Sequence, residues 1–473
     1  MLIRQFELEG LGHLSALVAD ETAGVAAIVD PRRDVDVYLE AAAAAGVRIT
    51  HVVETHLHND YVSGARELAA LTGATHMIGA GAELRYEHRP LRDHESFDVG
   101  WIRLTTLDTP GHTPEHVAFE VSDETATGTP PAGRQARGLL FTGGSLLVGS
   151  VGRTDLLGPE SAAPLARQMY HSLHDVLLDR DDGVAVYPTH GAGSLCSTGL
   201  SSEQSSTIGR ERRSDPLLRP MEVEAFVHAL LKGQPDVPGY FARMRPMNQA
   251  GPRLVGAHPP LPPTLSVDAA RGVLDRGGLL IDARSPLRYA RGHPVGAISI
   301  PADPSFGTWL GWVVEPDRPL VLLVRRPADL DDLVRQAYRV GYEALEGVIE
   351  GGWSAWQASG APTATLPSVS VERLAGLVAS GSRSSPVVID VRQTSEFESG
   401  HVPGSWHLMA GWLPDRLSQL PRDRPLATIC ASGYRASIAA SLLQRAGFGD
   451  VVRVEDGVVA WEAAGYPIER GAR

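Results

Sequence analysis

The chain has 473 residues, which is too many for one hydrophobic core and predicts about three domains. Acidic residues outnumber basic ones by 56 to 43, and the formal net charge of −13 argues against nucleic acid or an anionic membrane as the main partner. No apolar run approaches the roughly 20 residues of a membrane span, and Glu7 and Glu9 near the N-terminus are not typical of an export signal. We therefore expect a cytoplasmic protein that acts on small molecules.

The first half of the chain alternates β-branched apolar runs with helical patterns, which predicts a layered α/β sandwich. Strands are expected at residues 2–8, 14–18, 26–29, 49–53, 101–107, 117–121, 139–142 and 184–187. Helices are expected at 35–45, 64–71 and 164–178. The segment 122–137, with its TATGTPPAG core, is predicted to be a flexible surface insertion.

Three histidine-bearing loops follow strand-like runs in this half. The loop ETHLHNDYVSG carries His56, His58 and Asp60. The turn TPGHTPEH presents His112, and YPTHGAGS presents His190. Neutral imidazoles with a carboxylate suit Zn(II) or Fe(II) better than Ca(II) or Mg(II), which prefer oxygen ligands. The first loop alone is also compatible with solvated histidines, but the recurrence of strand, turn and histidine favours a metal site.

This pattern resembles the metallo-β-lactamase fold, and within it the persulfide dioxygenase and glyoxalase II branch, whose loops read THxHxDH, TPGHT and FTGD. The resemblance covers roughly the first half of the chain and implies an αβ/βα sandwich. Two positions depart from the family pattern: Tyr61 stands in place of a second histidine, and FTGG places Gly144 where the metal-binding aspartate is expected.

The departure at Gly144 bears directly on the ligand set that the resemblance implies. In the persulfide dioxygenases two histidines and that aspartate hold iron, and His56 and His112 match the two histidines. Without the carboxylate, the site takes water, recruits His58, Asp60 or His190, or binds no metal. A zinc site made by His56, His58 and His112 is a further option.

The chain has two cysteines, Cys196 and Cys430, far apart in the sequence, so a disulfide framework is not indicated. Cys196 lies six residues after His190, and we expect it near the mouth of the metal site unless it is simply a small buried residue. This HGAGSxC arrangement is similar to that of bacterial persulfide dioxygenases fused to rhodanese domains. The arginines of the following polar stretch are interpreted either as a solvated face, which we favour, or as contacts for an anion such as a glutathione carboxylate.

A proline-rich stretch at 245–264, RPMNQAGPRLVGAHPPLPPT, predicts a semi-rigid linker and a domain boundary. Beyond it, the sequence repeats with an offset of about 106 residues, as DAR at 282–284 and DVR at 390–392 illustrate. Each copy alternates strands and helices, which predicts a doubly wound parallel sheet. We therefore predict three domains, at residues 1–250, 262–360 and 366–473.

The DxR, GHxPGA-like and GxxAW signatures of both copies resemble those of rhodanese domains. In the last copy, the strand expected at 426–429 delivers Cys430 into the loop CASGYR, and a helix is expected at 436–444. Backbone N–H groups of such a loop and the positive end of the helix can lower a thiol pKa and stabilise a persulfide. The loop residues concerned are Ala431, Ser432, Gly433 and Tyr434. Arg435 is expected to be a cation for an anionic donor.

The middle copy has Val324 where the cysteine is expected and Asp329 where the arginine is expected. It therefore retains neither nucleophile nor cation. We interpret this domain as a spacer, a docking surface or part of a dimer contact, and a homo-oligomer is left open.

The two resemblances together imply an enzyme of sulfur metabolism. Its first domain is expected to resemble a persulfide dioxygenase with Fe(II), and its last to be a sulfurtransferase that forms a Cys430 persulfide. The implied partners are a persulfide or thiosulfate-type donor and glutathione or another small thiol, with Cys196 as a candidate way station. Two alternatives remain: a zinc-dependent thioester hydrolase of the glyoxalase II type, and a metal-free scaffold that carries an active rhodanese domain.

Overall fold

The computed structural model describes residues 1–123, 138–197, 199, 201–380 and 385–471. They form two compact units, which are treated separately below: Met1–Pro259 with Tyr338–Gly341, and Pro260–Ala337 with Tyr342–Arg473. Most of the predicted insertion at 122–137 lies outside the described residues. None of the helices in the described ranges is long and apolar enough to cross a membrane.

The first unit is built on two six-stranded sheets. The first sheet has the strand order β1 (Leu2–Leu8), β2 (His13–Asp20), β3 (Val25–Val29), β4 (Arg48–Glu54), β5 (Thr75–Gly79) and β6 (Arg89–Leu91). The second has the order β12 (Ser206–Thr207), β11 (Ala185–Pro188), β10 (Leu139–Gly143), β9 (Val117–Asp123), β8 (Ile102–Asp108) and β7 (Ser96–Val99). Strands β3 to β6 run parallel, as do β10 and β11.

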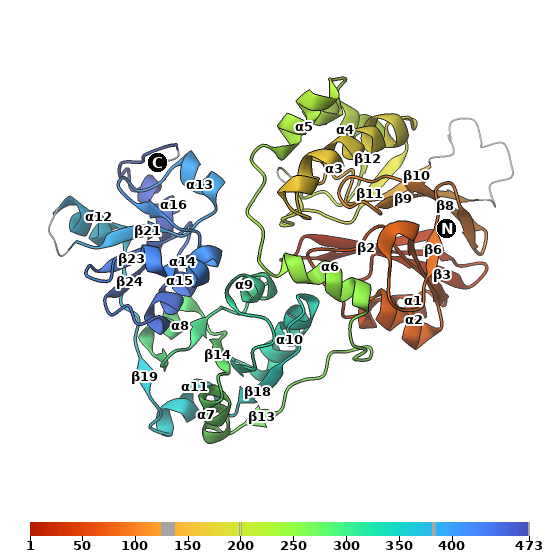
Figure 1. Cartoon of the computed structure of the whole chain (residues 1–473). Coiled ribbons are helices and arrows are strands. Elements are labelled where there is room, and N and C mark those ends of the chain that lie inside the picture. Colours follow the sequence, from red (N-terminus) through yellow and green to blue (C-terminus); the bar gives the residue numbers. More distant parts are fainter. Residues whose placement is uncertain (124–137, 198, 200, 381–384, 472–473) are drawn as a thin grey trace. The chain divides into compact units, whose positions relative to one another are not determined.

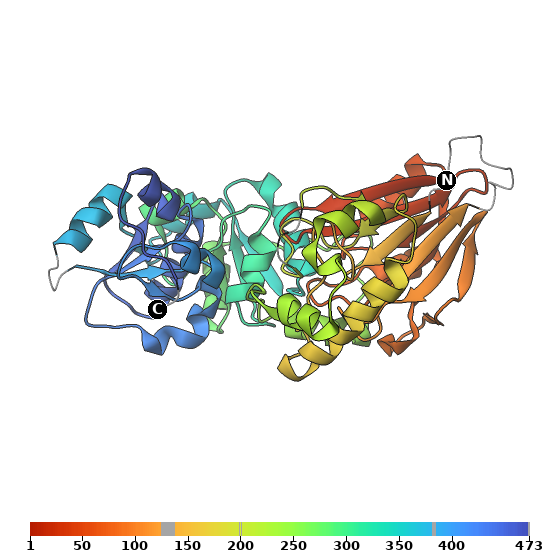
Figure 2. The same ribbon diagram turned by 90° about the horizontal axis from the view of Figure 1, so that it is seen from above.

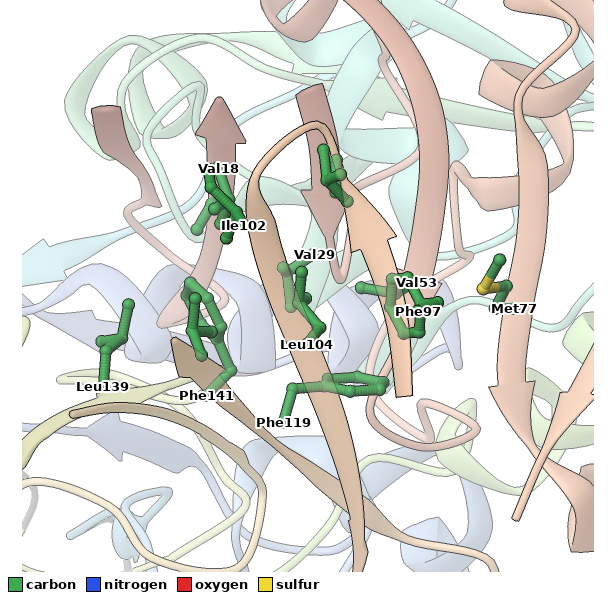
Figure 3. Packing of buried hydrophobic residues seen from close by; sticks show 14 of the residues in the cluster. Val18, Val29, Val53, Met77, Phe97, Ile102, Leu104, Phe119, Leu139 and Phe141 are labelled. Atoms are coloured by element: carbon green, nitrogen blue, oxygen red, sulfur yellow. The ribbon is translucent and has the colours of Figure 1, made fainter. Parts of the chain in front are cut away.

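The main core lies between the two sheets. Figure 3 shows Val18, Val29 and Val53 of the first sheet packed with Leu104 and Phe119 of the second. The side chains that alternate with these along the strands of the first sheet point to its outer face. They are also apolar, because helices cover that face. Alternate side chains of one strand therefore serve two different cores.

Helices cover the outer faces of both sheets (Figure 1). Helices α1 (Asp36–Ala44) and α2 (Ala65–Thr72) lie on the first sheet. On the second lie α3 (Pro159–His171) with the π-helical turn η2 (Ser172–Leu177), α4 (Ile208–Ser214) and α5 (Val223–Leu231). This confirms the predicted αβ/βα sandwich.

The linker prediction is wrong for its first six residues. Helix α6 (Phe241–Ala250) includes Pro246, and it ends only at Gly251. Proline suggests a linker by composition, but its fixed φ is compatible with a helix, and only one backbone hydrogen bond is lost. The contacts that hold α6 in place are described with the site below.

The second unit contains two five-stranded parallel sheets with equivalent strand orders. The middle copy has the order β13 (Thr264–Leu265), β18 (Leu345–Ile349), β17 (Leu320–Leu323), β14 (Leu279–Asp282) and β16 (Ile298–Ser299). The last copy has the order β20 (Ser368–Val369), β24 (Val451–Val454), β23 (Leu426–Ile429), β21 (Val387–Asp390) and β22 (Trp406–His407). The duplication is therefore also a duplication of topology.

Helices flank both sheets, as expected for doubly wound domains. In the middle copy they are α7 (Val267–Asp275), α8 (Pro286–Arg291), α9 (Phe306–Val313), α10 (Leu330–Arg339) and α11 (Gly352–Ala358). In the last copy, drawn in blue in Figure 2, they are α12 (Val371–Ala379), α13 (Thr394–Ser399), α14 (Leu413–Arg416), α15 (Tyr434–Arg445) and α16 (Gly457–Ala463).

Candidate metal centre and persulfide loop

Three buried histidines from three loops meet in the first unit. His56 follows the end of β4, His112 lies between β8 and β9, and His190 follows β11. Each is at most 1% exposed, and their ring centroids lie 4.9 to 5.4 Å from one another. One nitrogen of each lies within 4.8 Å of the others, so the three side chains could hold one metal ion.

The Nδ1 atoms of these histidines face outer partners. Thr55 Oγ1 lies 2.9 Å from Nδ1 of His56, and the carbonyl oxygen of Arg153 lies 2.7 Å from Nδ1 of His112. Oδ2 of Asp60 lies 3.4 Å from Nδ1 of His190. A carbonyl or carboxylate only accepts, so the Nδ1 atoms of His112 and His190 carry the hydrogen.

The same assignment holds for His56 by a further step. The hydroxyl of Thr55 donates its hydrogen to Oδ2 of Asp30, at 2.8 Å. It must then accept from Nδ1 of His56, which leaves the lone pair of that ring on Nε2. Asp30 also accepts from the backbone N–H of Thr55 and from the hydroxyl of Thr189, so it ties the first histidine loop to the third. Asp30 was not predicted as a site residue.

The Nε2 atoms point into the shared centre. His56 Nε2 and His190 Nε2 are 3.4 Å apart, and Nε2 of His112 has no hydrogen-bond partner in the described structure. A metal ion between these two atoms could bind a lone pair of each. Burial lowers the pKa of His112 to about 3, which keeps its imidazole neutral and able to bind a metal.

The donor set fits a metal ion. Metal–nitrogen bonds of about 2.0–2.1 Å in a tetrahedral arrangement place two ligand nitrogens roughly 3.4 Å apart, which matches the separation of the two Nε2 atoms. Ligand histidines in metal sites almost always have the other ring nitrogen bound to an outer partner; His56 and His112 do so here, and Nδ1 of His190 lies 3.4 Å from the carboxylate of Asp60. A metal-binding centre is therefore a property of this unit.

Gly144 lies against His112. A Cβ atom at position 144 would lie 2.3 Å from Cδ2 of His112, so the imidazole fills the space where a side chain would begin. The N–H of Gly144 donates to Nε2 of His116 at 2.9 Å, and Nδ1 of His116 pairs with the hydroxyl of Thr109. His116, which was not predicted, therefore positions the Gly144 loop with both of its nitrogens engaged.

His58 is not part of this group of three histidines. Its Nε2 lies 3.4 Å from Oδ1 of Asp30 and 3.7 Å from Oε1 of Glu54. The ring of Tyr61 stacks on His58 with centroids 4.4 Å apart. His58 can group with Asp60 and His190 in a second potential ligand set, so His190 belongs to both sets.

Helix α6 holds the first histidine loop in place. The side-chain amide of Asn248 donates to the carbonyls of His58 and Tyr61, both at 3.0 Å. Arg245 makes a bidentate ion pair with Glu115 at 2.8 and 2.9 Å, and Glu115 in turn accepts from the N–H of Leu57. Helix α6, which the composition assigned in part to a linker, thus fixes the loops that carry His56 and His112.

Cys196 lies in the same centre. It is 1% exposed, and it lies close enough to His190 for that side chain to influence the pKa of its thiol. Burial and the charge of Asp60 raise the pKa of this thiol, while His190 lowers it. The arginines of the following stretch pair with surface carboxylates, Arg210 with Glu203 and both Arg212 and Arg213 with Asp182, as the solvated-face interpretation predicts.

The second unit carries the predicted persulfide loop after β23. Cys430 is fully buried, and its Sγ accepts a hydrogen bond from the N–H of Gly433 at 3.1 Å. Ala431 and Ser432 are more accessible and lie at the surface side of the loop, and Tyr434 begins α15. The cysteine therefore lies between the end of a parallel strand and the positive end of a helix.

Arg435 is not a free cation. Its guanidinium donates to both oxygens of Glu396, at 2.5 and 2.7 Å. Glu396 also accepts from the backbone N–H of Gln393, which fixes it at the first turn of α13. The positive charge of Arg435, which was expected to attract an anionic donor, is therefore balanced by Glu396. Glu396 was not predicted from the sequence.

Family models match both halves of the chain. The Metallo-beta-lactamase superfamily model matches residues 8–127, and the Rhodanese-like domain model matches residues 266–359 and 370–464. The chain belongs to the metallo-β-lactamase superfamily in its first unit and carries two rhodanese-like domains in its second. This is the predicted fused architecture, and it places the chain among the enzymes of sulfur metabolism.

Individual relatives agree with this assignment. The chain is 28% identical to the mitochondrial persulfide dioxygenase ETHE1 of Bos taurus over 49% of this chain and 81% of that protein. It is 33% identical to a sulfurtransferase of Allochromatium vinosum over 17% of this chain and 77% of that protein. Among solved structures, a metallo-beta-lactamase from Staphylococcus aureus shares 30% identity, with a TM-score of 0.65 over 74% of this chain and 98% of that one.

Proposed function

We propose that residues 366–473 catalyse sulfur transfer through a persulfide on Cys430. The observation that carries this proposal is the thiol itself, buried after β23 with its sulfur bound to the N–H of Gly433 at the start of a helix. Rhodanese-like domains match this part of the chain. Residues 262–360, which have Val324 in the equivalent position, are assigned no catalytic role.

The reaction divides into two displacements at sulfur. The Cys430 thiolate attacks the outer sulfur of the donor, the S–S bond of the donor breaks, and its electron pair leaves with the departing thiolate or sulfite. A second thiolate then attacks the outer sulfur of the Cys430 persulfide, and Cys430 leaves as a thiolate. The N–H of Gly433 stabilises the anionic sulfur in both steps, and a hydrogen bond to a charged group is worth about 1.5–3 kcal/mol.

Mass spectrometry tests this proposal. After incubation with a persulfide or thiosulfate, we expect the peptide that contains Cys430 to gain one sulfur atom, about 32 Da, as covalent catalysis requires. Cys430→Ser should neither gain this mass nor produce thiocyanate from thiosulfate and cyanide. Cys196→Ser is the matched control, because it removes the other cysteine and leaves this loop intact. Sulfur transfer that persists in Cys430→Ser would refute the assignment.

For the first predicted domain, residues 1–250, we propose oxidation of a low-molecular-weight persulfide such as that of glutathione, with Fe(II) as the metal. The similarity to persulfide dioxygenase ETHE1, which spans most of that relative, supports this reaction. Bound iron would offer coordination positions to both dioxygen and the substrate sulfur. His56 and His112 would hold it, oriented by Thr55 and by the carbonyl of Arg153.

Cys196 is assigned a relay role in this half of the proposal. His190 lies close enough to influence the pKa of the Cys196 thiol, so a sulfur atom carried on Cys196 would lie near the metal centre. We expect Cys196→Ser to lower oxygen uptake with glutathione persulfide and to leave sulfur transfer by Cys430 unchanged. Unchanged oxygen uptake in this variant would refute the relay role of Cys196. The roles proposed for Cys430 and for the metal centre would not be affected.

One observation favours a second candidate activity. Three imidazoles around one centre are also the ligand set of hydrolytic zinc enzymes, in which zinc lowers the pKa of bound water. The metal content and the oxygen uptake of the purified enzyme separate the candidates. About one iron per chain with oxygen uptake supports the dioxygenase. Zinc with thioester hydrolysis supports the hydrolase, and absence of metal supports a scaffold.

A further inference from the structure

The metal centre lacks the carboxylate ligand expected from the family pattern, and its geometry points to a replacement. Gly144 has no side chain, and a Cβ there would lie 2.3 Å from Cδ2 and 2.9 Å from Nε2 of His112. The backbone of Gly152 packs closely against Gly144 on the other side, because a Cβ at Gly152 would meet the carbonyl oxygen of Gly144. The third ligand must therefore come from another loop.

We propose that His190 is this third ligand, so that His56, His112 and His190 hold the metal through their Nε2 atoms in a three-histidine site. The proposal rests on the metal-dependent half of the function proposed above. It differs from the zinc set predicted from sequence, in which His58 was the third histidine. It also gives Asp60 a different role from that of a ligand.

The surroundings of the ring nitrogens distinguish His190 from His58. Nδ1 of His190 faces Asp60 at 3.4 Å, which leaves its Nε2 for the centre, where it lies 3.4 Å from Nε2 of His56. Nε2 of His58 faces the carboxylates of Asp30 and Glu54 instead. His58 is only two residues from His56 in sequence, but the group whose ligand atoms lie within 4.8 Å of one another contains His56, His112 and His190 and not His58.

Asp60 is 2% exposed, and its carboxylate oxygens have no hydrogen bond that satisfies the usual geometry among the described residues. Its Oδ2 lies 3.4 Å from Nδ1 of His190. A carboxylate in this position fixes the tautomer of the ligand histidine and raises its basicity. Asp60 therefore acts as a positioning residue.

The exchange of ligand changes the charge of the centre. Three neutral imidazoles leave a divalent ion with one more positive charge than two imidazoles and a carboxylate do. Such a centre binds an anionic sulfur ligand more strongly, because the sulfur supplies the negative charge that the protein no longer provides. The substrate class this favours is a small persulfide that binds as an anion.

Metal affinity of the full-length protein tests the ligand set without recourse to activity. We would load chelator-treated protein with Co(II) and measure its dissociation constant by chelator competition, together with its visible absorption spectrum. His190→Ala should weaken binding by more than the roughly 10–100-fold cost of losing an outer partner, and Asp60→Asn should fall within that range. His58→Ala, the matched control on the first loop, should lose less than either and keep the spectrum of the unaltered protein.

Gly144→Asp provides a second test with an expectation opposite to that from the family pattern. The new side chain would displace the His112 ring, so we expect Co(II) affinity to fall rather than to rise. Thermal unfolding without metal reports whether each variant still folds, and the rise in Tm on adding Co(II) gives an independent measure of binding.

The Co(II) measurements can overturn the assignment of His190 as the third ligand. Loss of Co(II) in His58→Ala with retention in His190→Ala would overturn the proposal, as would tighter binding in Gly144→Asp. Failure of the unaltered protein to bind Co(II) would overturn it as well, with the role of Cys430 unaffected. If His190 proves to be a ligand but the iron-loaded enzyme consumes no oxygen with a persulfide, the ligand set stands and the dioxygenase assignment fails.

Discussion

The two rhodanese-like domains share a framework of paired charges. In the middle copy, Arg284 makes a bidentate ion pair with Asp282 at 2.8 and 2.5 Å. In the last copy, Arg392 pairs with Asp390 at 2.9 and 2.6 Å. Both arginines are buried and both aspartates end a central strand, so each pair stabilises the bend that follows the strand.

Aromatic stacking in the two copies is also equivalent. Tyr289 and His293 stack with centroids 3.7 Å apart and planes 5° apart, and Phe397 and His401 do so at 3.7 Å and 8°. Replacement of Tyr by Phe preserves the stack because the ring, not the hydroxyl, makes the contact. The middle copy has therefore kept the interactions on which its fold depends.

The loops after the central strand differ. Cys430 in the last copy corresponds to Val324, and Arg435 corresponds to Asp329. Asp329 pairs with Arg326, its neighbour on the same loop, where Arg435 pairs with Glu396 on a separate helix. The loop of the middle copy also contains Pro327, which has no N–H to offer. The two copies therefore share the framework and differ in the loop to which we assign sulfur transfer.

The middle copy also contacts the helix that follows the active loop. The N–H of Ser299 donates to the hydroxyl of Ser441 at 3.0 Å, and the hydroxyls of Ser299 and Ser437 are 3.0 Å apart. The hydroxyl of Tyr434 donates to Oδ1 of Asp303 at 3.1 Å. These contacts join the two copies within one compact unit, and the roles of spacer, docking surface or dimer contact stay predictions.

The largest effect on sulfur transfer is expected when Cys430 of the last copy is replaced by valine, the residue at the equivalent position of the middle copy. Cys430→Val removes the nucleophile and keeps a small buried side chain, so we expect sulfur transfer to fall by at least about 10³-fold with little change in stability. Thiocyanate formation and urea unfolding measure the two quantities. A stable variant with substantial turnover would show that the comparison has identified the wrong thiol.

Equivalent glycines near the two loops give the next largest contrast. Gly457, at φ +73°, would place a Cβ 2.3 Å from the carbonyl oxygens of Cys430 and Ala431, whereas Gly352, at φ +57°, would place it 3.3 Å from that of Val324. Both alanine variants bear the left-handed penalty of roughly 1–2 kcal/mol.

Only Gly457→Ala must also move the active loop. We expect it to lower kcat/KM for sulfur transfer about 10–100-fold, because misplacement of reacting groups by about 1 Å has that effect. Gly352→Ala is the matched control and should change stability alone. Equal losses of activity in the two variants would mean that the carbonyl contact of Gly457 does not position the cysteine.

How far the sequence could predict this molecule is clearest at these loops. Strand, turn and chemical residue are local in sequence, so Cys430 and the three histidine loops were found directly. Their partners were not, because Glu396 lies 39 positions from Arg435, and Asn248 lies 190 from His58, with no local pattern to connect them. Helix α6 was not predicted, because Pro246 made the composition of its segment resemble that of a linker.

A smaller effect is expected from Glu396→Gln, which leaves Arg435 with an unbalanced charge. We expect kcat/KM for thiosulfate, a dianion, to rise by about 3–10-fold, since like and unlike charges near the surface interact by on the order of 1 kcal/mol. Turnover of a glutathione persulfide should change less. Glu398→Gln, on the exposed side of the same helix, is the control. A fall in thiosulfate turnover would show that the pair is needed to hold the loop.

The smallest effect is expected from the reverse exchange, Val324→Cys. The new thiol would lie at the end of an equivalent strand, but Pro327 offers no N–H, and Asp329 places a carboxylate where the last copy has Arg435. A thiolate near an unfavourable charge and without the backbone donor that Gly433 provides in the last copy is a poor acceptor of sulfur. In a Cys430→Ser background we therefore expect no mass gain at residue 324. A persulfide at this position would show that the framework alone, without the loop, suffices for sulfur transfer.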